Sequence, residues 1–314
     1  MDVSLVIVSY NVQEPLRSCL DSAAVAAAGS GLQVGTIVVD NASTDGSAAM
    51  VETEFGDVTL LRSAVNEGYG AACNRGAGAS GGEILVFLNA DVELVGGALR
   101  ELVAALPDDA GAGLAGPAVV DAAGHLHRSV RRFPSPSGWL LDGTIFERWW
   151  GTRWLLAGYR PAVEPGRLSR VDWVEGACLA VRREAFTAIG GFDAGYFMYC
   201  EELDLCRRLQ EQGRSVLYVP AAVVTHQGGA SAGQAAAINR ARFLRSKVRY
   251  ADRTWSRTMA AVAATFYASA LVLELALELI KALVPAGDRG GRVRAVGTIA
   301  RSLWLFATGG TRRD

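Results

Sequence analysis

The 314-residue chain has a mass of 33.1 kDa; half of its residues are hydrophobic and a fifth are charged. This composition excludes a disordered chain and a disulfide-stabilised miniprotein, and the length suffices for about two domains. The net charge of −1 conceals an asymmetry, because residues 1–239 carry 27 acidic and 17 basic side chains and residues 240–314 carry 5 acidic and 14 basic ones. The near-neutral total predicts no nucleic-acid partner, but the basic C-terminal end needs its own explanation.

The five cysteines are scattered, and no two of them form a C-x-x-C pair. This spacing indicates neither a zinc site nor a disulfide framework, so we expect reduced cysteines in the cytoplasm. The apolar run at residues 5–8 is short and follows no basic residues, which argues against a signal peptide.

The first hundred residues predict alternating strands and helices. The expected strands cover residues 3–10, 35–40, 58–63 and 83–91, and helices are expected at 15–28, after residue 40 and at 69–79. Apolar strands separated by helices predict an α/β fold with a parallel sheet buried on both faces.

Polar residues follow each of these strands. They are Ser9, Asn11, Asp40, Asn66, Asn89 and Asp91. Because ligands in open α/β sheets bind beyond the carboxyl ends of the strands, we expect these residues to surround one cleft.

Beyond residue 100 the pattern becomes mixed. We expect a helix at 96–106, a strand at 171–181, helices at 184–190 and 200–212, and two short strands at 215–220 and 222–226. No linker separates this part from the first hundred residues. The sequence therefore predicts a single catalytic domain over residues 1–238, with a nucleotide-binding half at 1–100 and an acceptor-binding half at 101–238.

Asp40 is the last residue of its strand and is followed by Asn41, Ser43 and Thr44. A helix N-cap explains Ser43 or Thr44, but Asp40 comes too early for that role. Its carboxylate could accept the imide N–H of a uracil or thymine ring.

The pair Gly68-x-Gly70 is a fragment of a dinucleotide fingerprint. It follows the third strand instead of the first, and Cys73 replaces the third glycine, so it supports a nicotinamide oxidoreductase only weakly. A tight turn or close helix packing explains both glycines almost as well.

Asn89 and Asp91 flank Ala90 after an apolar strand. Two oxygen-bearing side chains in such a segment can hold a divalent cation, which would neutralise a diphosphate leaving group. Capping of the following helix by Asp91 is the structural alternative.

The acids Glu201, Glu202 and Asp204 open one helix. Interaction with the helix dipole can explain all three. Helical spacing places Glu202 on the face of Leu205, Cys206 and Leu209, whereas Asp204 can pair with Arg207 or Arg208. Glu202 is thus the preferred general base, Glu201 the second candidate and Asp204 a structural residue. His226, at a strand end, is as compatible with a structural role as with ligand binding.

Taken together and in this order, these motifs resemble inverting glycosyltransferase family 2, whose members have the GT-A fold. The matching segments are residues 8–11, 38–47, 66–76, 88–94, 173–193 and 197–209, with His226. Within the family the chain looks most like rhamnosyltransferase-type members that extend lipid-linked cell-surface glycans.

The resemblance implies a role for each matched residue. Ser9, Tyr10, Asn11, Asp40, Asn66, Gly68 and Asn89 would surround the nucleotide-sugar; Asp91 and His226 would bind Mg²⁺ or Mn²⁺; Glu202, with Glu201, would supply the base; and Trp173, Gly176 and Ala177 would bind the acceptor. Asn89 replaces the family's first Asp, and Glu202 replaces its usual Asp. The implied donor is dTDP-rhamnose, with UDP-galactofuranose or a UDP-hexose as alternatives, and the implied acceptor is a glycan on a polyprenyl diphosphate.

The basic C-terminal region, residues 239–314, carries two apolar stretches. Residues 259–273 form an apolar run of 15, short of the roughly 20 needed to span a bilayer, and Glu274, Glu278 and Lys281 follow it. A second helix is expected at 293–308, surrounded by Arg289, Arg292, Arg294, Arg301, Arg312 and Arg313. Amphipathic helices among arginines predict peripheral binding to the anionic inner face of the cell membrane; packing within the protein or in a homodimer is the alternative. A non-catalytic, membrane-associated binding protein is also compatible with this region.

Overall fold

The computed structural model describes residues 2–108, 111–127, 129–148, 166–226, 236–283 and 289–310. The chain divides into two compact units. The first, here called the sheet unit, comprises residues 1–133, 161–194 and 201–231, and the second, the helical unit, comprises residues 134–160, 195–200 and 232–314. Of the described residues, 134–148 and 195–200 thus belong to the helical unit although they precede the division expected at residue 238.

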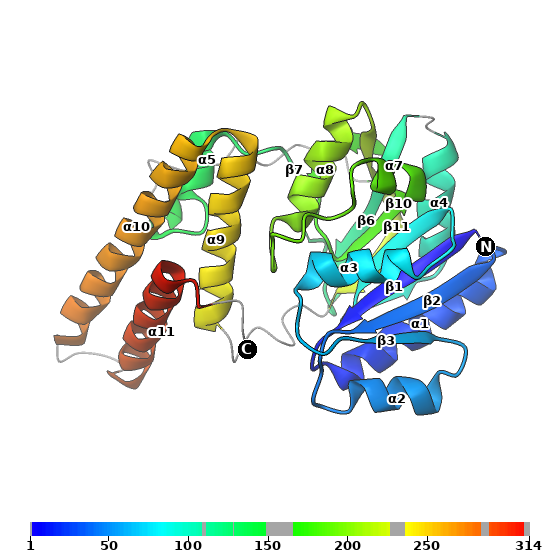
Figure 1. Ribbon diagram of the computed structural model, residues 1–314, viewed down its shortest axis with the longest axis horizontal. Coiled ribbons are helices and arrows are strands. Elements are labelled where there is room, and N and C mark those ends of the chain that lie inside the picture. The colour runs from blue at the N-terminus through cyan, green and yellow to red at the C-terminus, as the bar shows by residue number, and fades with distance from the viewer. Residues whose placement is uncertain are drawn as a thin grey trace. The chain divides into compact units, whose positions relative to one another are not determined.

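One mixed sheet forms the centre of the sheet unit (Figure 1). Its strands are β1 (Val3–Ser9), β2 (Val34–Asp40), β3 (Thr59–Arg62), β4 (Ile84–Asn89), β5 (Val92–Val95), β6 (Ala112–Val120), β8 (Ser169–Val171), β10 (Cys178–Arg182) and β11 (Ser215–His226). They lie in the order β3-β2-β1-β4-β10-β6-β11-β5, and β8 pairs with β11. Strands β1 to β4 are parallel, as expected from their alternation with helices.

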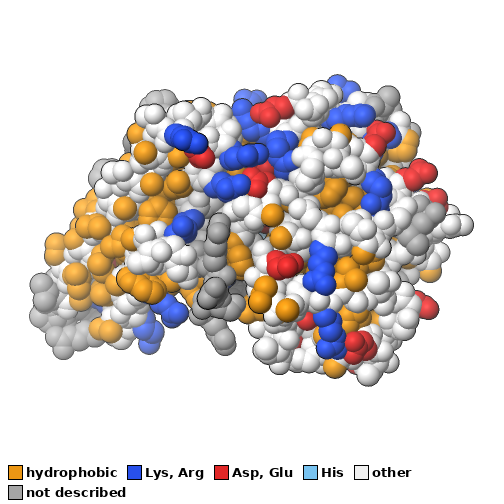
Figure 2. Space-filling model, viewed as in Figure 1, with side chains coloured by type: hydrophobic (Ala, Val, Ile, Leu, Met, Phe, Trp, Pro, Cys, Tyr) orange, Lys and Arg blue, Asp and Glu red, His pale blue; other side chains and the backbone are white. Residues whose placement is uncertain are grey.

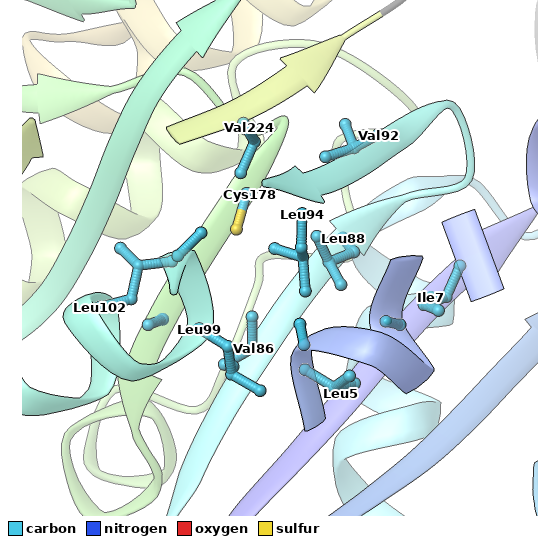
Figure 3. Packing of buried hydrophobic residues seen from close by; sticks show 14 of the residues in the cluster. Leu5, Ile7, Val86, Leu88, Val92, Leu94, Leu99, Leu102, Cys178 and Val224 are labelled. Carbon is cyan, nitrogen blue, oxygen red and sulfur yellow. The ribbon is translucent and has the colours of Figure 1, made fainter. Parts of the chain in front are cut away.

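Helices cover both faces of this sheet. They are α1 (Gln13–Ser30), α2 (Ser47–Glu54), α3 (Tyr69–Gly78), α4 (Ala98–Asp108), α7 (Arg183–Ala188) and α8 (Glu201–Glu211). Alternate residues of β1 and β4, among them Leu5, Ile7, Val86 and Leu88, pack in one cluster with Leu99 and Leu102 of α4 (Figure 3). The buried strand faces confirm the predicted α/β class.

The segment expected to be one strand at 171–181 is divided into three. Strand β8 pairs with β11, β9 (Trp173–Val174) pairs with β7 (Val130–Arg131) in a separate two-stranded sheet, and β10 lies between β4 and β6. The prediction failed because continuous hydrophobicity does not reveal a change of partner strand. The turn at residues 175–177 between β9 and β10 is thereby brought beside the end of β4, where the Asn89 N–H donates to the Ala177 carbonyl.

The two short strands expected at 215–220 and 222–226 form one strand, β11. Its pairing with β6 shifts register between Val219 and Val223, the stretch that contains Pro220. Because proline has no N–H to donate, an irregularity at this point lets the strand continue past it. His226 is thus placed at the end of a strand that pairs with both β6 and β5.

The helical unit consists of α5 (Pro136–Leu141), the 3₁₀ turn η1 (Ile145–Arg148), α9 (Ala236–Thr254), α10 (Arg257–Leu283) and α11 (Arg289–Thr308). Helix α9 packs against α10 and α11, and the aromatic residue Trp139 of α5 is buried against Tyr250 of α9, with ring centroids 4.9 Å apart. The two C-terminal helices expected from sequence are confirmed; Arg312 and Arg313 lie outside the described residues.

Helix α10 continues well beyond the 15-residue apolar run. Among the described residues, its segment Arg257–Ala282 is the one helix that is long and apolar enough to cross a membrane, a test that buried core helices also pass. Its acidic residues are paired, Glu274 with Arg240 at 2.5 Å and Glu278 with Lys281 at 2.6 Å. The length of the apolar run alone therefore does not rule out a membrane span.

Candidate functional site

The parallel strands bring Ser9 and Asp40 together at one edge of the sheet. They are register partners at the ends of β1 and β2, and both are buried, Asp40 being 4% exposed. One Asp40 carboxylate oxygen accepts a hydrogen bond from the Ser43 N–H at 3.3 Å. Within the described part of the chain, the other oxygen and the Ser9 hydroxyl have no hydrogen-bond partner. Buried polar atoms without partners are costly, so this pair is suited to receiving a polar ligand.

Asn41 organises the loop that carries Asn66 and Gly68. Its side-chain amide donates to Asn66 Oδ1 at 2.9 Å, and its own oxygen accepts the Glu67 N–H at 2.9 Å. Asn66 Oδ1 also accepts the Gly68 N–H, and Gly68 has a φ of 87° immediately before α3. The sequence predicted Asn66 and Gly68 as site residues but not Asn41. Its hydrogen bonds reach residues about 25 positions later in the chain, which a local pattern does not reveal.

Asn11 links the loops that follow β1 and β2. Its backbone N–H donates to Ser43 Oγ at 3.0 Å, and its side-chain oxygen accepts the Thr44 N–H at 2.7 Å. Asn11 has a φ of 54°, a conformation that asparagine tolerates better than most residues. Its side chain therefore fixes this rim of the site, and direct contacts of Asn11 or the half-buried Tyr10 with a nucleotide remain predictions.

Asp91 and His226 form a pair at the same end of the sheet. His226 Nε2 lies 3.2 Å from Asp91 Oδ1, and this hydrogen bond raises the pKa of His226 against the opposing effect of burial. Half-buried Asn89 ends β4 and leads through Ala90 into the turn that holds Asp91. Among the described residues, no group of three or more His, Cys, Asp or Glu side chains could hold a metal ion. A cation here would thus need further ligands from a bound phosphate or from water.

Glu201 and Glu202 begin α8 in different surroundings. Glu201 is buried at 6% exposure, and burial together with the charge of Glu202 raises its pKa well above the ordinary range. Glu202 is half-buried, and burial raises its pKa to about 7, with a further increase from Glu175. Burial therefore favours the neutral form of Glu201, whereas Glu202 is close to half ionised at neutral pH.

The turn between β9 and β10 lies against Glu202. A side chain at residue 176 would begin 3.3 Å from Glu202 Cβ, so any residue larger than glycine would press on the Glu202 side chain. Glu175 accepts a hydrogen bond from Arg131 at 2.9 Å, and its charge also acts on His226. Sequence reasoning chose Gly176 but missed Glu175, because nothing in a local pattern shows that it acts on both Glu202 and His226.

The remaining candidates are less accessible. Trp173 and Ala177 are buried, and the Trp173 indole N–H donates to the Arg132 carbonyl at 3.0 Å, so their contact with an acceptor stays a prediction. Asp204 pairs with Arg208 at 2.7 Å, the structural role expected for it. All of the candidate site residues lie in the sheet unit.

Comparison with known proteins decides the family. The protein-family sequence model described as Glycosyl transferase family 2 matches residues 4–188. This range includes Ser9, Asp40 and Asp91. The chain belongs to glycosyl transferase family 2. A second model, Glycosyl transferase family group 2, matches residues 135–307 and so extends over the helices of the helical unit.

Two curated relatives of this glycosyltransferase bear related names. N-acetylglucosaminyl-diphospho-decaprenol L-rhamnosyltransferase of Mycobacterium tuberculosis is 34% identical over 212 residues, covering 64% of this chain and 69% of the relative. Rhamnosyltransferase WbbL of Escherichia coli is 50% identical over 56 residues, 18% of this chain and 21% of the relative. The resemblance to rhamnosyltransferase-type family members is thereby confirmed.

A solved structure shows the same fold. GalNAc-T7, crystallised with UDP, GalNAc and Mn²⁺, superimposes with a TM-score of 0.57 at 17% identity over 98% of this chain, which spans 56% of that chain. The GT-A type of the sheet unit follows from this likeness. Family membership also favours a transferase over a nicotinamide oxidoreductase.

Proposed function

We propose that this family member transfers rhamnose from dTDP-rhamnose to a hydroxyl of a glycan carried on a polyprenyl diphosphate, with inversion at the anomeric carbon. The relatives' names support the sugar, and the name of the mycobacterial relative supports the lipid-linked acceptor. The observation that carries the chemistry is the position and pKa of Glu202. Its carboxylate lies beside the turn that contains Gly176, and its pKa is raised to about 7.

Glu202 is the proposed general base. A base acts best when its pKa lies near the working pH, and the pKa of Glu202 is about 7. Its carboxylate accepts the proton of the acceptor hydroxyl while the oxygen attacks the anomeric carbon and the nucleoside diphosphate leaves from the opposite face. The pKa of Glu201 is raised by burial and by the charge of Glu202, so the proposal assigns the negative charge to Glu202.

Asp40 and Ser9 are proposed to bind the nucleotide base. The Asp40 carboxylate oxygen that has no hydrogen-bond partner among the described residues can accept the imide N–H of thymine or uracil, and the Ser9 hydroxyl can donate to a ring or ribose oxygen. The Asn41–Asn66–Gly68 network holds the adjoining loop in place. Binding would thus supply hydrogen-bond partners for both buried groups.

Asp91 and His226 are proposed to hold Mg²⁺ or Mn²⁺, with Asn89 nearby. A carboxylate and an imidazole at 3.2 Å are suitable ligands, and substrate phosphates commonly complete such sites. The ion would neutralise charge on the diphosphate leaving group. The Mn²⁺ present in the GalNAc-T7 crystals is in keeping with this proposal.

The helical unit is proposed to bind the inner face of the cell membrane peripherally. Large hydrophobic side chains are exposed along α10 and α11, including Leu277, Ile280 and Trp304, and Figure 2 shows this apolar surface with basic side chains near it. Apolar helix faces combined with arginines favour anionic lipid. A homodimer formed through the same helices is the competing explanation.

A donor panel with and without metal tests the proposal. We expect dTDP-rhamnose with Mg²⁺ or Mn²⁺ to raise the melting temperature most, since ligand at a hundredfold excess over Kd stabilises by roughly 2.7 kcal/mol. Transfer is then measured with a synthetic polyprenyl-diphosphate GlcNAc acceptor. Preference for a UDP-sugar would overturn the donor assignment, and donor binding without transfer or hydrolysis would indicate a non-catalytic binding protein.

The variant Asp91→Ala tests the metal site in the same assay. We expect it to abolish the metal-dependent part of the thermal shift, because His226 alone is a weak site for a hard cation. Asp121→Ala is the matched control, because Asp121 is a turn carboxylate that pairs with His125 at 3.1 Å in the same way. Equal metal dependence of both variants would exclude Asp91 as a ligand.

A further inference from the structure

The six residues before Glu201, Gly195–Cys200, belong to the helical unit although the chain on both sides belongs to the sheet unit. Tyr199 and Cys200 have φ values of 70° and 66°, an unfavourable left-handed conformation for residues with side chains. Such backbone strain persists only where surrounding contacts enforce it, and it is concentrated at functional sites. The strained pair is followed directly by Glu201 and Glu202.

Helix α9 supplies polar contacts that hold this segment. The hydroxyl of buried Ser246 donates to the Met198 carbonyl at 2.7 Å. The guanidinium group of Arg249 lies directly against Gly195, so a side chain at residue 195 would require Arg249 to move. The hydrogen bond from the Ser246 side chain and the contact of Arg249 with Gly195 both hold the segment against α9.

Three contacts with aromatic rings also join the same helix to this segment. Arg242 lies over the Phe197 ring at 4.3 Å, Arg249 lies over the Tyr196 ring at 5.2 Å, and the rings of Phe243 and Tyr199 meet edge-on at 5.7 Å. Residues 242, 246 and 249 are spaced at i, i+4 and i+7, so one face of α9 makes contact along the segment. Each of the residues 195–199 has a contact with α9.

Other side chains of α9 tie it to α5 and α10. Lys247, completely buried, pairs with Asp142 at 3.1 Å and lies over the ring of Trp139 at 4.5 Å. Tyr267 of α10 donates its hydroxyl hydrogen to the Trp139 carbonyl at 2.8 Å. Helix α9 thus connects the apolar helix α10 with the segment that precedes the proposed base.

We infer that Ser246 and its neighbours on α9 are positioning residues that set the place of Glu202 through the Gly195–Cys200 segment. This inference rests on the proposed function. In physical terms, α9 holds the strained turn at residues 199–200, and that turn fixes where α8 begins and therefore where the Glu202 carboxylate lies. Small displacements of a catalytic group lower the rate of reaction far more than they lower substrate affinity.

The test compares Ser246→Ala with Ser302→Ala in the full chain. Ser302 is the control because it is also a buried serine of the helical unit. Its hydroxyl donates to the Thr298 carbonyl at 2.8 Å within α11. We expect Ser246→Ala to lower kcat by about tenfold with an unchanged Kd for dTDP-rhamnose, and to shift the pH of half-maximal kcat. We expect Ser302→Ala to keep the kcat and the pH profile of the unmodified protein. Equal kcat and pH profiles for the two variants would overturn the inference.

A second variant guards against misfolding of the first. Arg242→Ala removes the contact with Phe197, and Arg245→Ala, whose guanidinium donates to the Phe306 carbonyl of α11 at 3.1 Å, is its control. Loss of kcat at unchanged donor Kd for Arg242→Ala alone supports positioning, and equal behaviour of both variants contradicts it. Full activity of Glu202→Gln would instead refute the proposed function, so the two failures are distinguishable.

Discussion

Glu202 owes its chemical character to its surroundings. It is one of three acids in the first turn of α8, and each has a different environment: Glu201 is buried, Asp204 is neutralised by Arg208, and Glu202 lies against the Gly176 turn. Burial and the charge of Glu175 raise the pKa of Glu202 to about 7. At the scale of single residues, the proposed reaction therefore depends on a carboxylate that is ready to take up a proton.

Substituting this carboxylate tests its role directly. We expect Glu202→Gln to lower transfer at least a hundredfold, since general-base catalysis contributes roughly 10²–10⁴-fold, while donor Kd stays nearly unchanged. The control is Glu211→Gln, an exposed carboxylate at the end of the same helix. Transfer rates are measured with saturating donor. Similar rates for the two variants would remove Glu202 from the mechanism.

The raised pKa also predicts a pH dependence. Because the base must be ionised, kcat should rise with pH, reach half its maximum near pH 7, and fall about tenfold per pH unit below that. Stability should change in the opposite direction: the folded protein binds this proton more tightly than the unfolded chain, so the contribution of Glu202 to stability is lost as pH rises through 7. A half-maximum near pH 4.5 in a pH series of kcat would contradict this assignment.

At the scale of elements, helix α3 must lie very close to the sheet to carry the loop with Asn66 and Gly68. Gly76 makes this possible, because a Cβ at residue 76 would lie 2.4 Å from Val6 of β1 and 3.1 Å from Val39 of β2. At Gly78, two residues further along the helix, no described residue lies within 4 Å of the corresponding Cβ position. Packing against the sheet thus requires glycine at residue 76, whereas residue 78 has room for a side chain.

These two glycines give a matched pair of variants. We expect Gly76→Ala to lower the free energy of unfolding by about 1–3 kcal/mol through overpacking, and with it the affinity for donor. Gly78→Ala should be neutral or slightly stabilising, since alanine favours the helix by roughly 0.5–1 kcal/mol. Urea denaturation of both variants measures the difference. Equal stability would show that α3 moves away from β1 without cost.

At the scale of the whole molecule, opposite charges lie on different parts of the chain. The acidic excess belongs to residues 1–239 and the basic excess to residues 240–314, the region that also exposes the apolar faces of α10 and α11. Removal of everything after residue 256 would also remove Tyr267, which is bonded to Trp139. Point substitutions on the exposed face are therefore the cleaner test of membrane binding.

We expect the double variant Ile280→Glu/Trp304→Glu to bind vesicles of phosphatidylglycerol and phosphatidylcholine at least tenfold more weakly, because two exposed apolar side chains become charged. The control is Val25→Glu, an equally exposed apolar residue of α1 in the sheet unit. Flotation of the vesicles measures binding, and sedimentation of the free protein measures dimerisation. Unchanged flotation with loss of a dimer would assign the apolar face to subunit contact.

The sequence by itself determined the alternation of strands and helices, the polar residues at the strand ends and the two C-terminal helices. These features follow from local periodicity and from the rule that parallel strands gather their carboxyl ends at one edge. Ser9 and Asp40 could be placed in the same cleft in this way, whereas their pairing as register neighbours comes from the structure.

Only the tertiary structure decided the features that depend on contacts between distant parts of the chain. Residues 171–181 change partner strands, Glu175 acts on Glu202 and His226, and residues 195–200 pack on α9, which lies some forty residues later in the chain. A hydrophobic pattern records whether a side chain is buried but not which element buries it. For that reason Glu202 could be selected as the candidate base from the sequence. Its pKa, and the packing of the preceding segment Gly195–Cys200 on α9, could not be predicted.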